Sequence, residues 1–475
     1  MLAVLTRADQ PELFAMLQRL FASMVVDGEA DLAAQPKAWQ DIATNDLAPA
    51  FWALVRSQLG YADAEPSLRD LLVRVLVTDL CRSLDGAPPR QLAHFVLPDR
   101  ALAANASVFA ARWRSDLAFF SSYNMLARPV AQELNLAQLL TSYTAEQLTE
   151  CMAFEEVELR VVQDLKQRIV AGAGANMDVV HGLIARRRDG HWANPLLASA
   201  SERTRALAAC YDALTAAADF FSLKASHAAG FSFADAATAF GQYREYLYRF
   251  DQLYRHFHTA ADAVEPSGWA VLHELRTSIE NVYSGWFVPQ LGAAWAKVVE
   301  GDQGLLQRWA IPDVTPQQAF YEREVQPLYS GGAKRVFVVI SDALRYEVAQ
   351  ELVQFTNGKN RFKASLDAML GVLPSYTALG MAALLPHRTL AYKESANLDV
   401  LADGHLVATL EQRNEHLRSV GGMAIKAEDL MALGKEKGRE LVRDRQLIYI
   451  YHNRIDMTGD KQASESKTFE AAAQT

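Results

Sequence analysis

A run of five apolar residues, at positions 336–340, constrains the fold of this 475-residue chain more than any other feature. The run reads Val-Phe-Val-Val-Ile, so every residue is β-branched or aromatic and no polar residue alternates with them. Such a run is typical of a strand that is buried on both faces of a parallel sheet. The residues from Ser341 onward predict a helix that extends to about Phe355. Together they predict that an α/β unit begins near residue 331.

Two further strands are expected in this part of the chain, at residues 362–366 and 447–451. Strands that alternate with helices indicate a three-layer α/β domain with a sheet that is rich in parallel strands. In such sheets a ligand binds at the carboxyl ends of the strands. The carboxyl ends of the predicted strands are therefore where functional residues are expected.

The preceding residues, 1–325, predict a mostly α-helical region with two or more helical subdomains. Alanine, leucine, glutamine, arginine and glutamate are abundant there, and apolar residues recur at a spacing of three to four, as in residues 68–80 and 155–166. An aromatic-rich stretch at residues 240–257 could form a platform on which bases stack. Its helical spacing favours packing between helices instead. The expected organisation is a helical region at 1–325 and an α/β domain at 326–475.

Charge is distributed unevenly between these two parts. Residues 1–330 hold 28 basic and 38 acidic residues, whereas residues 331–475 hold 19 basic and 18 acidic residues. An acidic surface opposes bulk attraction to nucleic acid, because phosphate binding depends on a basic surface. Any DNA contact is therefore expected to be local and to involve the α/β domain. The sequence has no run of about 18 apolar residues and no signal-peptide pattern, which predicts a cytoplasmic protein without a membrane contact.

Asp342 follows the first predicted strand directly, so its carboxylate is expected at the carboxyl end of the sheet. Aspartate is also a common residue at the N-cap of a helix, and that interpretation remains open. Thr377 lies in the segment Leu-Pro-Ser-Tyr-Thr at positions 373–377, just before an alanine-rich helix. Its hydroxyl would suit a nucleophile that receives phosphate at a helix N-terminus, or it could be an ordinary cap.

Asp456 and Asp460 follow the last predicted strand by way of His452, Asn453 and Arg454. Two carboxylates four residues apart, with Gly459 allowing a tight loop, can converge on one divalent cation. A surface turn is the alternative, and His452 could be either a ligand or a histidine satisfied at the strand end. Taken together, the carboxylates and the hydroxyl at strand ends favour a metal-assisted phosphoryl or sulfuryl transfer site.

Three motifs carry a resemblance to a known family. They are Ser-Asp-Ala-Leu-Arg-Tyr-Glu at 341–347, the segment at 373–377, and Tyr-His-Asn-Arg-Ile-Asp at 451–456 with Gly459 and Asp460. These motifs resemble those of the PglZ family of BREX phage-defence systems, which belongs to the alkaline phosphatase superfamily. The resemblance covers roughly residues 320–475, and the helical part resembles the type A arrangement of PglZ only in general character.

The resemblance implies a role for each matching residue. Asp342 would bind one metal ion and contact the nucleophile, Thr377, while Asp456 and Asp460 would bind a second metal ion. Asp460 stands where the superfamily usually has histidine, and carboxylate ligands shift the preference from zinc toward harder ions. Two divalent ions are therefore expected in the full-length parent, as zinc or as manganese or magnesium.

Two arginines flank the proposed ligands. Arg345 and Arg454 could hold phosphate oxygens, because a planar guanidinium makes two parallel hydrogen bonds to phosphate. Alternatively, these arginines could form ion pairs with Glu347 or with other carboxylates, and the sequence favours neither role.

In this superfamily a segment of the Ala-Asp-His-Gly type completes one metal site and a later histidine usually completes the other, and the 475 residues contain no such segment. We therefore expect this chain to be the N-terminal part of a longer protein, with an incomplete phosphatase-like domain and impaired catalysis. The resemblance implies that the parent is a metal-dependent phosphatase, phosphodiesterase or nuclease in phage restriction. Other BREX proteins are the expected partners, and DNA is a further one. The alternative is a helical scaffold without catalysis that docks other BREX proteins.

Overall fold

The computed structural model describes residues 1–172, 176–196, 201–302, 304–394, 398–461 and 465–474. The described chain forms two compact units. The first unit contains Met1–Ser222 with Ala260–Ile279, and the second contains Leu223–Thr259 with Glu280–Thr475. The chain therefore passes from the first unit to the second, returns, and enters the second unit again.

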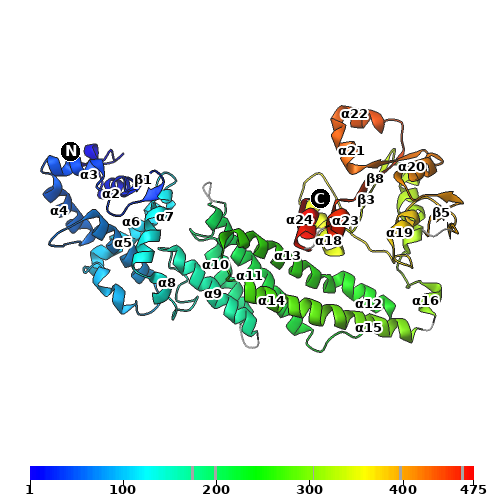
Figure 1. The fold of residues 1–475 in the computed structure, drawn as a ribbon, viewed down its shortest axis with the longest axis horizontal. Coiled ribbons are helices and arrows are strands. Elements are labelled where there is room, and N and C mark those ends of the chain that lie inside the picture. The colour runs from blue at the N-terminus through cyan, green and yellow to red at the C-terminus, as the bar shows by residue number, and fades with distance from the viewer. Residues whose placement is uncertain (173–175, 197–200, 303, 395–397, 462–464, 475) are drawn as a thin grey trace. The chain divides into compact units, whose positions relative to one another are not determined.

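Helices build the first unit, apart from one short antiparallel hairpin of β1 (Val25–Val26) and β2 (Glu29–Ala30). The helices predicted at residues 68–80 and 155–166 are confirmed as α5 and α9. The elements before residue 227, coloured blue to green in Figure 1, are α1 (Leu2–Leu5), α2 (Leu13–Ala22), α3 (Lys37–Thr44), α4 (Ala48–Leu59), α5 (Leu68–Ser83), η1 (Arg90–Phe95), α6 (Arg100–Ser115), α7 (Phe120–Glu133), α8 (Leu136–Leu139), α9 (Glu155–Ala171), α10 (Met177–Arg188) and α11 (Glu202–Ser226).

A buried ion pair lies in the core of the first unit. The guanidinium of Arg187 and the carboxylate of Glu158 are both fully buried, and Tyr211 donates a hydrogen bond of 2.5 Å to Glu158 Oε2. Arg187 also donates to the backbone carbonyls of Leu148, Thr149 and Cys151. Because every polar atom of the guanidinium fork has an acceptor nearby, this charge is tolerated in the core.

Helix α11 is long and apolar enough to cross a membrane by length and composition. However, 67% of its most apolar window is buried inside the protein. A core helix of a globular protein has the same properties, so this helix is weak evidence for a membrane span.

The second unit also begins with helices. Three π-helical turns interrupt or adjoin them, and each of these turns begins at a tyrosine. Helices α12 and α15 lie side by side (Figure 1). The elements from residue 236 to 330 are α12 (Ala236–Gln242), η2 (Tyr243–Leu247), α13 (Tyr248–Val264), η3 (Glu265–Ser267), α14 (His273–Val282), η4 (Tyr283–Phe287), α15 (Val288–Gly301), α16 (Leu305–Arg308), η5 (Gln317–Ala319), η6 (Tyr321–Val325) and α17 (Gln326–Ser330).

The aromatic-rich stretch at residues 240–257 packs between helices. Phe250 and Phe257 are fully buried. The ring of Phe250 stacks on that of Phe287 with centroids 4.4 Å apart, and Tyr254 stacks on Tyr283 at 3.9 Å. These rings are therefore core residues, as the helical spacing indicated, and they offer no open face on which bases could stack.

The α/β part occupies the remainder of the second unit. Its elements are β3 (Val336–Ser341), α18 (Tyr346–Asn357), α19 (Thr377–Ala383), β4 (Leu390–Tyr392), β5 (Val400–Ala402), β6 (His405–Leu406), α20 (Leu410–Arg418), β7 (Gly422–Lys426), α21 (Ala427–Ala432), α22 (Gly434–Leu441), β8 (Leu447–His452), α23 (Arg454–Lys461) and α24 (Glu465–Gln474).

Three of these strands form a parallel sheet in the order β3-β8-β7, which confirms the expected parallel α/β architecture. The strands predicted at 336–340 and 447–451 are β3 and β8. They pair in register from Val336 with Leu447 to Ser341 with His452. As a consequence, both strands end at the same edge of the sheet.

One expected strand is absent, and others were missed. Residues 362–366 form a loop rather than a strand. Strand β7 was not predicted, and neither was the small antiparallel sheet of β4, β5 and β6. Each strand of that small sheet has two or three residues. Such short strands depend on their neighbours and leave little periodic signal in the sequence.

The core of the α/β part lies on one face of the parallel sheet. Val336 and Val338 point into this core, together with Tyr449 and Tyr451 of β8, and α19 covers them with Leu379 and Met381. On the opposite face of β3, Phe337 is 50% exposed and Val339 is 62% exposed. The prediction that this strand is buried on both faces is therefore wrong, because within the described residues only one face of β3 has a covering layer.

Candidate carboxylate site at the strand ends

Two further hydrogen bonds join the carboxyl ends of β3 and β8, where the paired strands end. The backbone N–H of Asp342 donates to the carbonyl oxygen of His452 at 2.9 Å. The hydroxyl of Ser341 lies 3.0 Å from Nδ1 of His452. His452 is thus satisfied at the strand end through one ring nitrogen. These contacts bring the segment after β3 and the segment after β8 together.

Asp342 stands at this edge and is half-buried. It does not cap the following helix: α18 begins at Tyr346, and its N-cap residue is Arg345. The hydrogen bond recorded for the Asp342 carboxylate comes from the backbone N–H of Ala343, at 3.1 Å. The capping alternative is therefore wrong, and the carboxylate remains available to a ligand.

Ala343 has a φ of 61°, in the left-handed region that non-glycine residues rarely adopt. That conformation costs an L-residue about 1–2 kcal/mol. Backbone strain of this kind persists where the surrounding structure enforces it, and it clusters at functional sites. The strained turn directs the chain from β3 into α18 and sets the position of Asp342.

Asp456 and Asp460 lie on helix α23, not in the tight loop that the glycine suggested. Their spacing of four residues places both carboxylates on one face of the helix. Burial raises the pKa of Asp456, and the charges of Asp342 and Asp460 raise it further. The structure therefore brings Asp456 within electrostatic range of both Asp342 and Asp460.

Three acidic groups that repel one another suit a divalent cation, because oxygen ligands are those that magnesium, manganese and calcium prefer. Among the described residues, however, no three His, Cys, Asp or Glu side chains converge closely enough to hold a metal ion. The carboxylates share an electrostatic field but do not form a closed coordination shell. The oxygen donors are of the kind that a hard divalent cation prefers, but among the described residues they do not surround a single point where an ion could sit.

Thr377 is the first residue of α19, and it is exposed. The N-cap position belongs to Tyr376, which makes no side-chain cap, so the threonine is not the cap that the alternative interpretation expected. No interaction recorded in the described parts of the chain joins Thr377 to Asp342, Asp456 or Asp460. Its proposed partnership with the carboxylates remains a prediction.

Sequence reasoning missed a glutamine that fixes the loop before Thr377. The side chain of Gln317 accepts a hydrogen bond from the backbone of Val372 at 3.1 Å and donates to the carbonyl of Gly380 at 3.2 Å. The backbone of Gln317 also donates to Leu370 at 2.8 Å. One residue thus ties both ends of the segment that carries Thr377. No sequence signal marked it, since glutamine is common on helical surfaces.

The two arginines proposed as phosphate ligands have contacts within the protein. The guanidinium of Arg345 lies 5.3 Å from the ring centroid of Phe469 on α24. Burial raises the pKa of Glu347, and the charges of Arg255 and Arg345 only partly oppose that rise. Arg454 donates a hydrogen bond to Gln474, also on α24. Both arginines follow or precede a candidate ligand closely in sequence, and both contact the last helix, α24.

A second set of missed residues buttresses α18. Glu347 is 1% exposed, and its Oε1 lies 3.3 Å from Nε of Arg255 on α13. Arg255 also contacts Glu351 at 2.7 Å, and His256 reaches the same carboxylate at 2.5 Å. Burial opposes ionisation of Glu351, but hydrogen bonds from His256 and Arg255 outweigh it and lower the pKa of this carboxyl to about 2. The helix that follows Asp342 is thus anchored by charge to α13.

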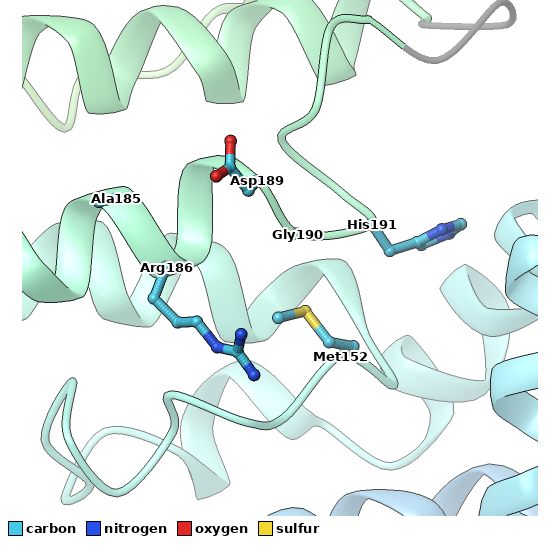
Figure 2. Close-up of a pocket in the computed structure, with 6 residues that line it drawn as sticks. All are labelled: Met152, Ala185, Arg186, Asp189, Gly190 and His191. Atoms are coloured by element: carbon cyan, nitrogen blue, oxygen red, sulfur yellow. The ribbon is translucent and has the colours of Figure 1, made fainter.

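A cavity of about 510 Å³ lies in the first unit, lined by Met152, Ala185, Arg186, Asp189, Gly190 and His191 (Figure 2). Arg186 is paired with Glu150 at 2.8 Å. Burial lowers the pKa of His191 to about 3, so this histidine is neutral. Figure 2 shows that the charged groups of Arg186 and Asp189 point in different directions. The cavity therefore lacks the convergent charges that phosphoryl chemistry requires.

Comparison with known proteins finds a family match for the α/β part of the chain. Residues 320–475 match the model of the BREX system PglZ alkaline phosphatase-like domain. This segment matches the PglZ family. The PglZ-like segment includes β3, α18, α19, β8 and α23, and therefore every residue proposed for the site. No solved structure matches the chain.

Two curated relatives extend the similarity beyond the PglZ-like segment. The alkaline phosphatase-like protein BrxZ of Escherichia coli O9:H4 (strain HS) is 35% identical over 473 residues, which are 99% of this chain and 54% of BrxZ. The alkaline phosphatase-like protein PglZ of Bacillus cereus (strain H3081.97) is 29% identical over 443 residues, which are 92% of this chain and 49% of that protein. The chain spans about half the length of the curated relatives it matches.

Proposed function

We propose that this chain carries part of a metal-dependent phosphohydrolase centre of the PglZ type, which serves a BREX phage-defence system and acts on phosphodiesters. The observation that carries the proposal is the group of three carboxylates, Asp342, Asp456 and Asp460, at the carboxyl ends of β3 and β8. Like charges gathered at a ligand-binding edge are costly unless a cation joins them. The match of residues 320–475 to a phosphatase-like domain supports the same interpretation.

In this proposal the three carboxylates hold divalent ions, and Thr377 is the nucleophile. A bound divalent cation supplies positive charge that favours the deprotonated hydroxyl and the leaving oxygen. Oγ of Thr377 attacks phosphorus as its proton passes to water, and the bond from phosphorus to the leaving alcohol breaks. Water then cleaves the phosphothreonine, which releases a phosphomonoester and restores the hydroxyl. Arg345 and Arg454 would steady the phosphate oxygens.

Metal binding tests the ligand set directly. Calorimetric titration of the 475-residue chain with Mn²⁺ and Zn²⁺ should show binding that Asp456→Asn weakens at least tenfold. Asp429→Asn, which removes an exposed carboxylate on α21, is the matched control and should leave the affinity unchanged. Equal affinity in Asp456→Asn and in the unaltered chain would contradict the assignment of the site.

Turnover tests the nucleophile. Hydrolysis of bis(p-nitrophenyl) phosphate with added metal should be lost in Thr377→Ala and partly retained in Thr377→Ser, because serine keeps the hydroxyl. We expect slow turnover by the 475-residue chain, since its described residues do not close a three-ligand metal site. Rapid, metal-dependent turnover that survives Thr377→Ala would exclude Thr377 as the nucleophile.

The open coordination geometry favours a second candidate, a helical scaffold that docks other BREX proteins without catalysis. Its support is the large helical first unit and the lack of a converged metal group among the described residues. Co-purification with the other proteins of the system, combined with metal analysis of the complex, separates the two functions. A stable complex without metal supports the scaffold, and stoichiometric metal supports the phosphohydrolase.

A further inference from the structure

The loop that follows α18 carries an unbalanced positive charge. Residues 352–366 contain Lys359, Arg361 and Lys363 and no acidic residue, in a chain whose formal net charge is -9. All three cations are exposed. A local excess of this kind is what contact with a polyanion requires in a protein that is acidic overall.

Two aromatic rings are interleaved with these cations and face solvent. Phe355, in the last turn of α18, is 65% exposed, and Phe362, in the loop, is 67% exposed. The ammonium group of Lys359 lies 4.4 Å from the ring centroid of Phe355. Exposing a phenylalanine to water is unfavourable, so two such rings beside three cations indicate an interaction surface.

Hydrogen bonds define the shape of the loop. The side chain of Asn357 donates to the carbonyl of Ala364 at 2.9 Å and accepts from its N–H at 2.8 Å. Within the loop, the N–H of Phe362 donates to the carbonyl of Lys359 at 3.1 Å. The reciprocal Asn357–Ala364 pair closes the loop at its base, so Phe362 is presented by a fixed turn.

The nearest acidic residues do not neutralise the loop. Glu351 is held by Arg255 and His256, and Asp367 pairs with Arg244 at 2.7 Å. Within the described residues, no ion pair is recorded for the three cations of the loop. Their charges therefore remain available to a ligand.

We propose that the surface formed by Phe355, Lys359, Arg361, Phe362 and Lys363 binds single-stranded nucleic acid, with bases stacked on the rings and phosphates against the cations. Stacking on aromatic side chains within a basic surface is the general mode of single-strand binding. A purely apolar protein partner would leave three cations without a counter-charge. A double helix keeps its bases stacked internally and cannot use the rings.

If the chain is part of a phosphodiesterase, this surface identifies single-stranded nucleic acid as its substrate class. That step of the inference rests on the proposed function. Helix α18 has 12 residues and separates the surface from the carboxylate site by about 18 Å at 1.5 Å per residue. A strand that keeps the 3.4 Å rise of a duplex covers that length with about five nucleotides, and a more extended single strand needs fewer. The binding itself requires neither metal nor turnover, so it can fail or succeed independently of the catalytic proposal.

Fluorescence anisotropy with a labelled 15-nucleotide oligothymidylate, in EDTA, tests the inference on the 475-residue chain. We expect binding that falls about tenfold in Phe362→Ala, since one stacked base contributes about that factor. Replacement of Lys359, Arg361 and Lys363 by glutamine should make the slope of log affinity against log salt shallower by about 2, at 0.7 per lost phosphate contact. An oligouridylate of the same length distinguishes DNA from RNA as the preferred strand.

Matched variants separate stacking from other effects. Phe362→Trp should retain affinity and Phe362→Leu should lose it, because leucine keeps the apolar surface but has no aromatic face. Lys435→Gln with Lys437→Gln, on the exposed helix α22, controls for total charge and should have little effect. Thermal unfolding checks that each variant folds. If neither oligonucleotide binds, or if Phe362→Leu binds as tightly as the unaltered chain, the proposal is wrong, and an apolar protein partner becomes the better interpretation.

Discussion

Nε of Arg255 lies 3.3 Å from Oε1 of Glu347, and this buried ion pair joins helix α13 to the helix that follows the candidate carboxylate site. Both side chains are at most 8% exposed. The pair spans 92 residues of sequence, and so it links the helical part of the second unit to the PglZ-like segment.

Removing one member of this pair should destabilise the second unit strongly. Arg255→Met leaves the buried Glu347 without its counter-charge, which costs about 3–5 kcal/mol. Differential scanning calorimetry should show a lower melting temperature for the transition of that unit. Arg418→Met breaks an exposed pair with Glu415 on α20 and should change stability by less than about 1 kcal/mol. The double variant Arg255→Met with Glu347→Gln should recover part of the loss, because Glu351 also loses Arg255 but keeps His256. A double variant less stable than Arg255→Met would show that the unpaired Glu347 is not the cause.

Relief of strain at Ala343 should stabilise the chain. Glycine adopts a φ of 61° without the steric cost that alanine has, so Ala343→Gly should raise the free energy of unfolding by about 0.5–1 kcal/mol. Ala349→Gly, in the interior of α18, is the control and should lower it by about 1 kcal/mol. Urea unfolding measures both. A loss of stability in Ala343→Gly would mean that the turn is not strained.

Charge repulsion at the carboxylate site should also be measurable without metal. Burial and the neighbouring carboxylates raise the pKa of Asp456, so the ionised group disfavours the folded state at neutral pH. Asp456→Asn should therefore stabilise the metal-free chain, by about 0.3 kcal/mol because solvent screens these groups. The gain should vanish as the pH falls and the carboxyl is protonated in both states. Thermal unfolding at a series of pH values, in EDTA, checks the sign.

His191 should make the first unit sensitive to acid. Burial lowers the pKa of this histidine from 6.5 to about 3, and its Nε2 lies 2.7 Å from Asn124. Between these pH values the unfolded chain binds a proton that the folded chain does not, so stability is lost as the pH falls through that window. The slope is at most about 1.4 kcal/mol for each pH unit. His191→Gln should reduce the pH dependence of the stability measured by calorimetry. An unchanged slope would show that other groups cause this dependence.

Much of the candidate site could be predicted from local sequence. The apolar runs at 336–340 and 447–451 predicted β3 and β8, and the rule that ligands bind at strand ends selected Asp342, Asp456 and Asp460. Local patterns could not decide whether Asp342 caps a helix. The start of α18 at Tyr346 leaves Arg345 as the N-cap residue and excludes that role, while the ligand role of Asp342 stays a prediction. Gly459 suggested a tight turn, yet Asp460 lies on a helix, because the packing of α23 against α24 outweighs the weak helix propensity of glycine.

The sequence by itself determined the elements whose signal is local: the apolar strands, the periodic helices and the acidic residues that follow the strands. Only the tertiary structure decided which of these elements meet. Parallel pairing brought Ser341 beside His452, and the Arg255–Glu347 pair anchored α18 to α13. It also decided that Phe337 and Phe362 face solvent. The physical reason is that hydrogen bonding between distant strands, charge pairing and burial depend on distances in space, which a linear pattern of residues does not encode.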